Sequence, residues 1–296
     1  MTARDKAPPR RSYYSVRSGK RPPGDGFNLD EFKRFFRTAF DKLWEDGLFQ
    51  EWFGYSCVDA GDVDGKAGRE IDLFVFRKLR ATGLWPIWDK LDSYSEENLF
   101  DMIEFLYDHA SKGIDGNYHQ YNQCGWHYSK FDPLDGREIF RQEMNEILTD
   151  YGHGFELSRD GEILTLAEDE FAPMLSAEIP HSDNENVRDR IEAAKVKYRR
   201  RSISERKDAI RDLADVLEFL RLEVKSVLNS KDEADLFQLA NNFGIRHHRK
   251  DQKTDYDSSI WLSWMFYYYL ATIHACLRLI EKSKKSESGS NAAESP

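Results

Sequence analysis

The sequence has few cysteines, no apolar leader and no internal repeat. Its three cysteines, Cys57, Cys124 and Cys276, are an odd and sparse set, which argues against a disulfide framework and for a reducing compartment. The first residues, MTARDKAPPRR, contain no apolar h-region, so we expect no secretory signal. These absences predict a soluble, cytoplasmic protein.

Long apolar runs are equally scarce, and Ile260–Ile280 is the one stretch long enough to span a bilayer. His274 and Arg278 interrupt it, and its tyrosines lie at its middle rather than at its ends, where membrane interfaces place them. A helix that is apolar on all sides also suits the centre of a helical bundle. We therefore expect no membrane partner.

Charge is distributed unevenly within a net charge of −10. Residues 1–26 contain seven Lys or Arg against two Asp or Glu, whereas residues 27–182 contain 15 against 32 and residues 183–282 contain 19 against 17. The acidic middle should repel nucleic acid, so a polyanion would bind the basic start or the near-neutral last part. The charge distribution alone is better explained by ordinary solvated surface.

Apolar periodicity predicts a mainly α fold in two domains. We expect a basic extended arm at 1–26, an acidic, mainly helical domain at 27–182 with a small β-hairpin near 155–166, a helical bundle at 183–282 and a disordered tail at 283–296. The helices are expected at Leu29–Asp46 after the cap Asn28, Glu70–Thr82, Ser93–Ala110 from a capping box with Glu96, Gly136–Tyr151, Val187–Arg200, Ser202–Leu228 from a second capping box with Glu205, Asp232–Phe243 and Ser258–Lys282.

One motif has the short spacing of metal ligands, His119-x4-Cys124-x2-His127. Cys57 could complete a tetrahedral zinc site with it, but a second close pair of ligands is missing. Aromatic residues crowd the segment, so the favoured interpretation is an irregular loop at 112–135 packed by those rings. We accordingly predict no metal, no other cofactor and no identifiable small-molecule ligand. The Asp-Val-Asp-Gly run at 62–65 fits neither a calcium loop nor a phosphate loop.

The most suggestive chemistry lies at Arg246-His247-His248, directly after an expected helix end at Gly244. An arginine fork suits a phosphate, and a histidine near neutral pKa moves protons to or from a ribose hydroxyl. These three are the candidate catalytic residues for metal-independent RNA cleavage, and Arg249, Lys250 and Lys253 are candidates for binding the RNA backbone. Alternatively, the arginine caps the preceding helix and the histidines hydrogen-bond within the bundle.

The order of these C-terminal elements resembles the HEPN superfamily of small helical bundles, found in many abortive-infection and toxin proteins. The likeness lies in a long amphipathic helix, a shorter helix, the polar corner Asn241–His248 and a long aromatic final helix. The segment Tyr151–Ile163 also looks like an element that precedes such domains. The resemblance implies RNA binding or ribonuclease activity in prokaryotic antiviral defence, with a site formed across a homodimer.

The corner departs from the HEPN ribonuclease pattern, in which four to six residues separate the arginine from the histidine. Here His247 and His248 follow Arg246 directly. Some HEPN domains serve only in binding or dimerisation. Two functions therefore stay open, an RNA-directed, ribonuclease-like protein of defence or stress response and a non-catalytic scaffold.

Overall fold

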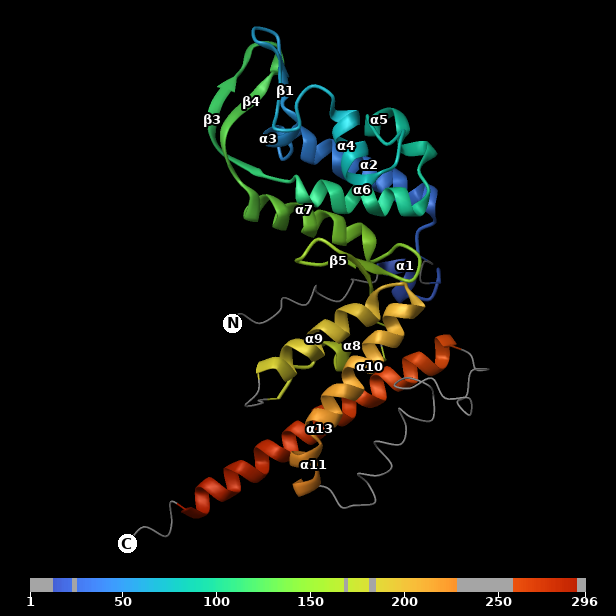
Figure 1. Ribbon diagram of the computed structural model, residues 1–296. Helices are drawn as coiled ribbons and strands as arrows, with labels where there is room; N and C mark the ends of the chain where they lie inside the picture. The colour runs from blue at the N-terminus through green and yellow to red at the C-terminus, as the bar shows by residue number, and fades with distance from the viewer. Residues whose placement is uncertain (1–12, 23–25, 168–169, 181–184, 228–257, 292–296) are drawn as a thin grey trace.

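The computed structural model describes residues 13–22, 26–167, 170–180, 185–227 and 258–291 (Figure 1). Within these ranges the chain is mostly helical, and its strands form three separate two-stranded antiparallel hairpins. The prediction of a mainly α fold is therefore confirmed. No helix in the described ranges is long and apolar enough to cross a membrane.

The elements fall into two successive groups, each with its own buried apolar cluster. The first group comprises α1 (Tyr14–Arg17), α2 (Leu29–Glu45), α3 (Gln50–Phe53), β1 (Tyr55–Cys57), β2 (Gly61–Val63), α4 (Ile71–Leu79), α5 (Ile87–Lys90), α6 (Glu96–Asp108), β3 (Lys112–His119), β4 (Gly125–Asp132), α7 (Pro133–Leu148), β5 (Phe155–Leu157) and β6 (Ile163–Thr165). The second group comprises α8 (Ala172–Ser176), α9 (Glu185–Arg199), α10 (Ile203–Phe219), α11 (Arg221–Val227) and α13 (Ser258–Asn291).

Helix α2 forms the spine of the first group. It begins at a full capping box, in which the Asn28 side chain accepts hydrogen bonds from the amides of Asp30 and Glu31 and the Glu31 carboxylate accepts one from the Asn28 amide. Its apolar residues recur every three or four positions, so one face is buried. Phe32 and Phe40 on that face are completely inaccessible to solvent.

Aromatic rings fill the space beside α2. The ring of Phe40 lies 5.7 Å from those of Trp44 and Phe49 and 5.2 Å from that of Trp88, measured between centroids. The indole of Trp88 donates a hydrogen bond of 2.9 Å to Asp41, which satisfies its polar atom at the edge of the cluster. This packing fixes α2 against the segment that contains α3 and α5.

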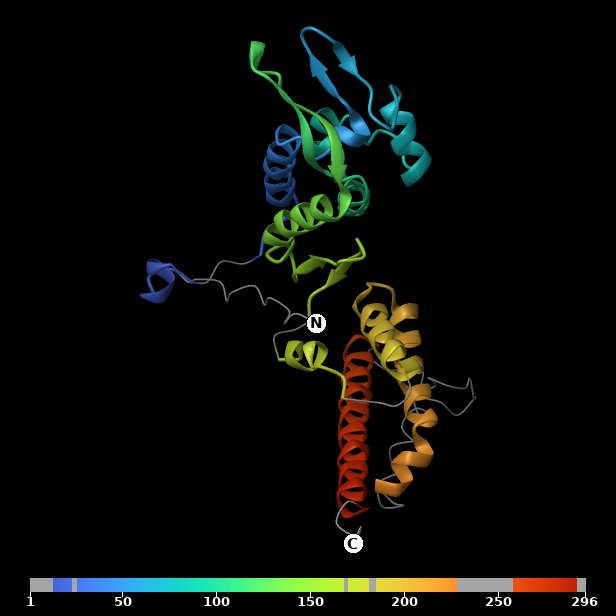
Figure 2. The same ribbon diagram turned by 90° about the vertical axis from the view of Figure 1, so that its left-hand side faces the viewer.

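The second group is a helical bundle in which α10 packs against α9 and α13 (Figure 2). The predicted apolar stripe of α10 is buried, with Ile210 and Leu213 fully enclosed. Between α9 and α13, the rings of Tyr198 and Phe266 stack with centroids 3.8 Å apart. Phe266 and Tyr269 of the last helix are therefore bundle core.

Ion pairs join the two groups where α9 meets the β5–β6 hairpin. Arg199 lies 2.8 Å from the Glu156 carboxylate, and Arg200 lies 2.6 Å from that of Glu162. Because each ion pair is partly exposed, each adds little to stability on its own. Together the two pairs fix the orientation of the hairpin on the helix.

The structure corrects three sequence-based expectations. The tail expected at 283–296 is helical as far as Asn291, because α13 continues through it. Ser95 caps α6, because its hydroxyl accepts a hydrogen bond from the Asn98 amide. The sequence pattern predicts Ser93 for this role. Residues 112–132 are not an irregular loop, because β3 and β4 pair along them in a long antiparallel hairpin. The expected hairpin near 155–166 is confirmed as β5 and β6.

Candidate metal centre

The corner predicted from the sequence lies outside the described residues. Arg246, His247, His248, Arg249, Lys250 and Lys253 all fall within 228–257, as does the expected helix at 232–243. The described side chains show a different cluster with chemical potential, in the first group of elements.

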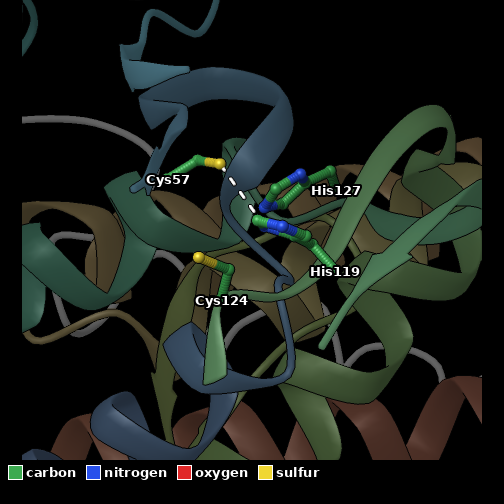
Figure 3. A group of neighbouring side chains, drawn as sticks. All are labelled: Cys57, His119, Cys124 and His127. Carbon is green, nitrogen blue, oxygen red and sulfur yellow. Dashed lines mark hydrogen bonds between the residues drawn. The ribbon is translucent and has the colours of Figure 1, made fainter. Parts of the chain in front are cut away.

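Cys57, His119, Cys124 and His127 converge on one point (Figure 3). Each offers one ligand atom, and these four atoms all lie within 4.8 Å of one another. The residues come from two hairpins. Cys57 ends β1 and His119 ends β3, whereas Cys124 directly precedes the returning strand β4 and His127 lies within it. Both hairpins lie at the end of the molecule opposite α13 (Figure 1).

The pairing of β3 with β4 explains how three ligands meet. His119 pairs with Gly125 and Asn117 pairs with His127, so His119 and His127 share one face of the hairpin. The chain reverses through a short 3₁₀ turn in which Asn122 has a φ of 50° and Gly125 a φ of 81°. This tight turn brings Cys124 back beside His119.

One separation matches a metal site closely. The Cys57 Sγ lies 3.6 Å from the His119 Nδ1. Zinc bonds of about 2.3 Å to sulfur and 2.0 Å to nitrogen at a tetrahedral angle put those two atoms roughly 3.6 Å apart. The two side chains therefore already have the spacing of ligands on a common ion.

The far nitrogen of His119 is held by a carboxylate. Its Nε2 lies 3.1 Å from Oδ2 of Asp59, in the turn between β1 and β2. Histidines that bind metals usually donate their second ring N–H to such a group, which fixes the tautomer and the ring orientation. Asp59 thus leaves the Nδ1 of His119 as the lone-pair donor that faces Cys57.

His127 is fixed by its neighbours, yet one of its ring nitrogens has no protein partner. Its imidazole stacks on Tyr55 with centroids 4.2 Å apart, and its Nε2 is buried without a hydrogen bond. Gln50 holds the two chain neighbours of His127. Its side-chain amide accepts a hydrogen bond of 3.2 Å from the Tyr128 N–H and donates one of 2.8 Å to the Trp126 carbonyl. A buried nitrogen without a partner is costly, and a bound cation removes that cost.

The arrangement also resembles a catalytic triad, with Cys57 as the nucleophile, His119 as its base and Asp59 as the orienting acid. Two observations weigh against that chemistry. The Cys57 side chain is only 5% exposed, whereas a nucleophile must reach its substrate. A triad would also leave Cys124 and His127 without a role, while a metal site uses all four residues.

Sequence reasoning named all four residues, with Cys57 as the possible fourth ligand, but predicted no metal because a second close pair of ligands was missing. Cys57 lies 62 residues before His119, and the β1–β2 hairpin brings it there. The spacing of a single distant cysteine could not decide between a zinc site and a packed loop, and the fold supplies the proximity.

No family model, curated protein or solved structure matches the sequence. The conclusions below therefore depend on the residues and their geometry.

Proposed function

We propose that the first group of elements binds one structural Zn²⁺ through Cys57, His119, Cys124 and His127. The observation that carries this proposal is the convergence of four ligand atoms within 4.8 Å from two separate hairpins. Two thiolates and two imidazoles are a ligand set typical of zinc. Four protein ligands close the coordination shell and leave no position for substrate, so the role is structural.

The hairpins need such a link because they contribute little to the apolar core. Among the described residues, no side chain between Ala110 and Phe140 belongs to the buried cluster of the first group. Strands β1 and β2 have three residues each, and a two-stranded hairpin alone is marginally stable in water. The zinc would tie both hairpins together where apolar packing does not.

We expect the purified protein to contain one zinc per chain, measured by elemental mass spectrometry. Cys124→Ser should lose the metal, whereas Cys276→Ala, which alters a buried cysteine of the bundle, should retain it. Cobalt substitution should give the visible bands of a tetrahedral thiolate site in the wild type. Asp59→Asn should weaken zinc affinity about 10- to 100-fold while keeping the stoichiometry.

A wild-type protein that contains no zinc, and gains none on addition of zinc salts, would contradict the proposal. Equal metal content in Cys124→Ser and the wild type would do the same.

For the second group we propose an RNA-directed function of the HEPN type, in prokaryotic defence or stress response, exerted by a cytoplasmic homodimer. Support comes from the Arg246-His247-His248 corner and from the order of its helices. The buried apolar stripe of α10 and the aromatic packing of α13 are compatible with such a bundle. A non-catalytic HEPN-like scaffold is the alternative.

Induction in a bacterial host tests this second proposal. Wild type should arrest growth and fragment tRNA or mRNA, and Arg246→Ala and His248→Ala should do neither, because both would lack a group that contacts or protonates the scissile phosphodiester. Growth and intact RNA in all three strains would instead favour the scaffold. The Cys276→Ala protein serves as the control for a substitution in the same bundle.

A further inference from the structure

The two thiols of the metal centre lie close enough to react with each other. Their Sγ atoms belong to the set of four ligand atoms that all lie within 4.8 Å of one another (Figure 3). A disulfide needs a sulfur separation of about 2.05 Å, whereas two thiolates on one tetrahedral zinc lie about 3.8 Å apart. A bond between Cys57 and Cys124 therefore excludes a zinc ion bound to both sulfurs.

Both cysteines lie beside turns that have open space around them. Cys57 pairs with Gly61 across the tip of the β1–β2 hairpin, and Cys124 directly precedes Gly125 at the turn of β3–β4. Both glycines have a positive φ, and a Cβ at either would meet no heavy atom within 4 Å. Bringing the sulfurs to bonding distance needs a shift of roughly 3 Å at most. The two turns can share that shift.

The two cysteines differ in accessibility, and this difference sets the order in which they react. Cys124 is partly exposed, whereas Cys57 is only 5% exposed. A small oxidant in the solvent therefore reaches Cys124 first, and Cys57 is the neighbouring second thiol. A zinc ion keeps both sulfurs deprotonated, and the thiolate is the form that an oxidant attacks.

The third cysteine of the chain is set apart from this chemistry. Cys276 is buried in the helical bundle, among the residues of the second apolar cluster. Burial raises the pKa of its thiol, and a buried thiol in apolar surroundings is unreactive. Cys276 is therefore an internal control for oxidation at the metal centre.

We propose that the metal centre is a redox switch, in which a peroxide replaces the zinc ion by a disulfide between Cys57 and Cys124. This inference rests on the proposed zinc site. The Cys124 thiolate attacks one peroxide oxygen, the O–O bond breaks, and the departing hydroxide takes a proton from solvent to become water. The Cys57 thiolate then attacks the sulfur of the Cys124 sulfenic acid. The S–S bond forms, the S–O bond breaks, and a second hydroxide leaves and is protonated to water.

The balance of the two steps explains the loss of the metal. Two thiolates, one peroxide and two protons give one disulfide and two waters, with the peroxide as the two-electron oxidant. The ion is left with His119 and His127 as its only protein ligands, where a structural zinc site needs four, so Zn²⁺ is released. The disulfide keeps the two hairpins joined, and the two imidazoles are freed from the ion.

Zinc release and thiol loss in the full-chain protein test the switch. Zinc content is measured first, and the loaded protein is then treated with a moderate excess of hydrogen peroxide in the presence of a zinc-binding dye. We expect release of one Zn²⁺ per chain, a fall from three free thiols to one, and a Cys57–Cys124 disulfide in the peptide map. Dimedone, which traps sulfenic acids, should label Cys124. A thiol reductant with zinc salt should restore the starting state.

The matched control is Cys276→Ala, which should release zinc as the wild type does and lose both of its remaining thiols. A chain that binds no zinc before oxidation contradicts the zinc site, and the switch with it. Zinc that stays bound after peroxide treatment, with all thiols free, overturns the switch alone. Zinc release with Cys124 oxidised to a sulfinic acid and Cys57 still a thiol also overturns it. A disulfide between two chains, seen on a non-reducing gel, does the same.

Discussion

Removing the zinc is expected to open both hairpins at the metal centre while the helices of the first group stay folded. A ligand present at about a thousand times its dissociation constant stabilises the state that binds it by about 4 kcal/mol. The apolar cluster of that group does not extend into β3 and β4, so this stabilisation acts locally. Amide exchange in β1–β2 and in β3–β4 should therefore accelerate up to about a thousandfold on chelation, with little change in α2 and α6.

Hydrogen–deuterium exchange followed by mass spectrometry measures this effect segment by segment. Cys57→Ser should behave as the chelated wild type does, and Cys276→Ala should respond to chelator as the wild type does. Equal protection of the hairpins with and without metal would contradict the prediction, because contacts such as those of Gln50 would then hold the hairpins without the ion.

Phe40→Ala is expected to destabilise the first group by about 3 to 5 kcal/mol, the cost of emptying a phenylalanine site in a packed core. Phe40 is 0% exposed and contacts rings from α2, α3 and α5, so the cavity cannot collapse without moving several elements. Native stabilities of about 5 to 15 kcal/mol make this a large fraction of the total. The loss is read from the midpoint of chemical unfolding.

Phe35→Ala provides the matched control for this prediction. Phe35 lies on the same helix but is 45% exposed, and its tilted ring contacts Phe27 with centroids 4.4 Å apart. Its removal should cost about 1 kcal/mol or less. Similar losses in the two variants would contradict the packing argument. Both proteins should still bind one zinc per chain in the folded state, which separates core stability from the metal centre.

Local signals predicted the helices well where the apolar period was clear. The expected first helix at 29–46 became α2 at Leu29–Glu45, and the cap Asn28 was right. The α6 cap was predicted two residues early, at Ser93 instead of Ser95. Both serines precede the apolar pattern of the helix, so the local motif does not decide which of them is the cap. Ser93 ends a 3₁₀ turn, and the helix therefore begins after Ser95.

The β3–β4 hairpin could not be predicted from the same kind of signal. This segment is rich in glycine and polar side chains instead of alternating apolar ones, so it lacks the periodicity that predicts a strand. Gly116 shows the reason for one of these glycines, because a Cβ there would lie 2.3 Å from the His127 carbonyl oxygen across the hairpin. The composition that suggested a loop is what lets the strands approach.

The metal centre also has a consequence for the unfolded chain. Cys57 and His119 are 62 positions apart, and α4, α5 and α6 lie in the segment between them. An ion that bridges these residues would act as a reversible cross-link across that segment. Closing a loop of this length lowers the entropy of the unfolded ensemble by an amount worth about 4 kcal/mol in the chain-entropy model. On the ribosome the four-ligand site cannot form until His127 has emerged, after α2 to α6 have been synthesised.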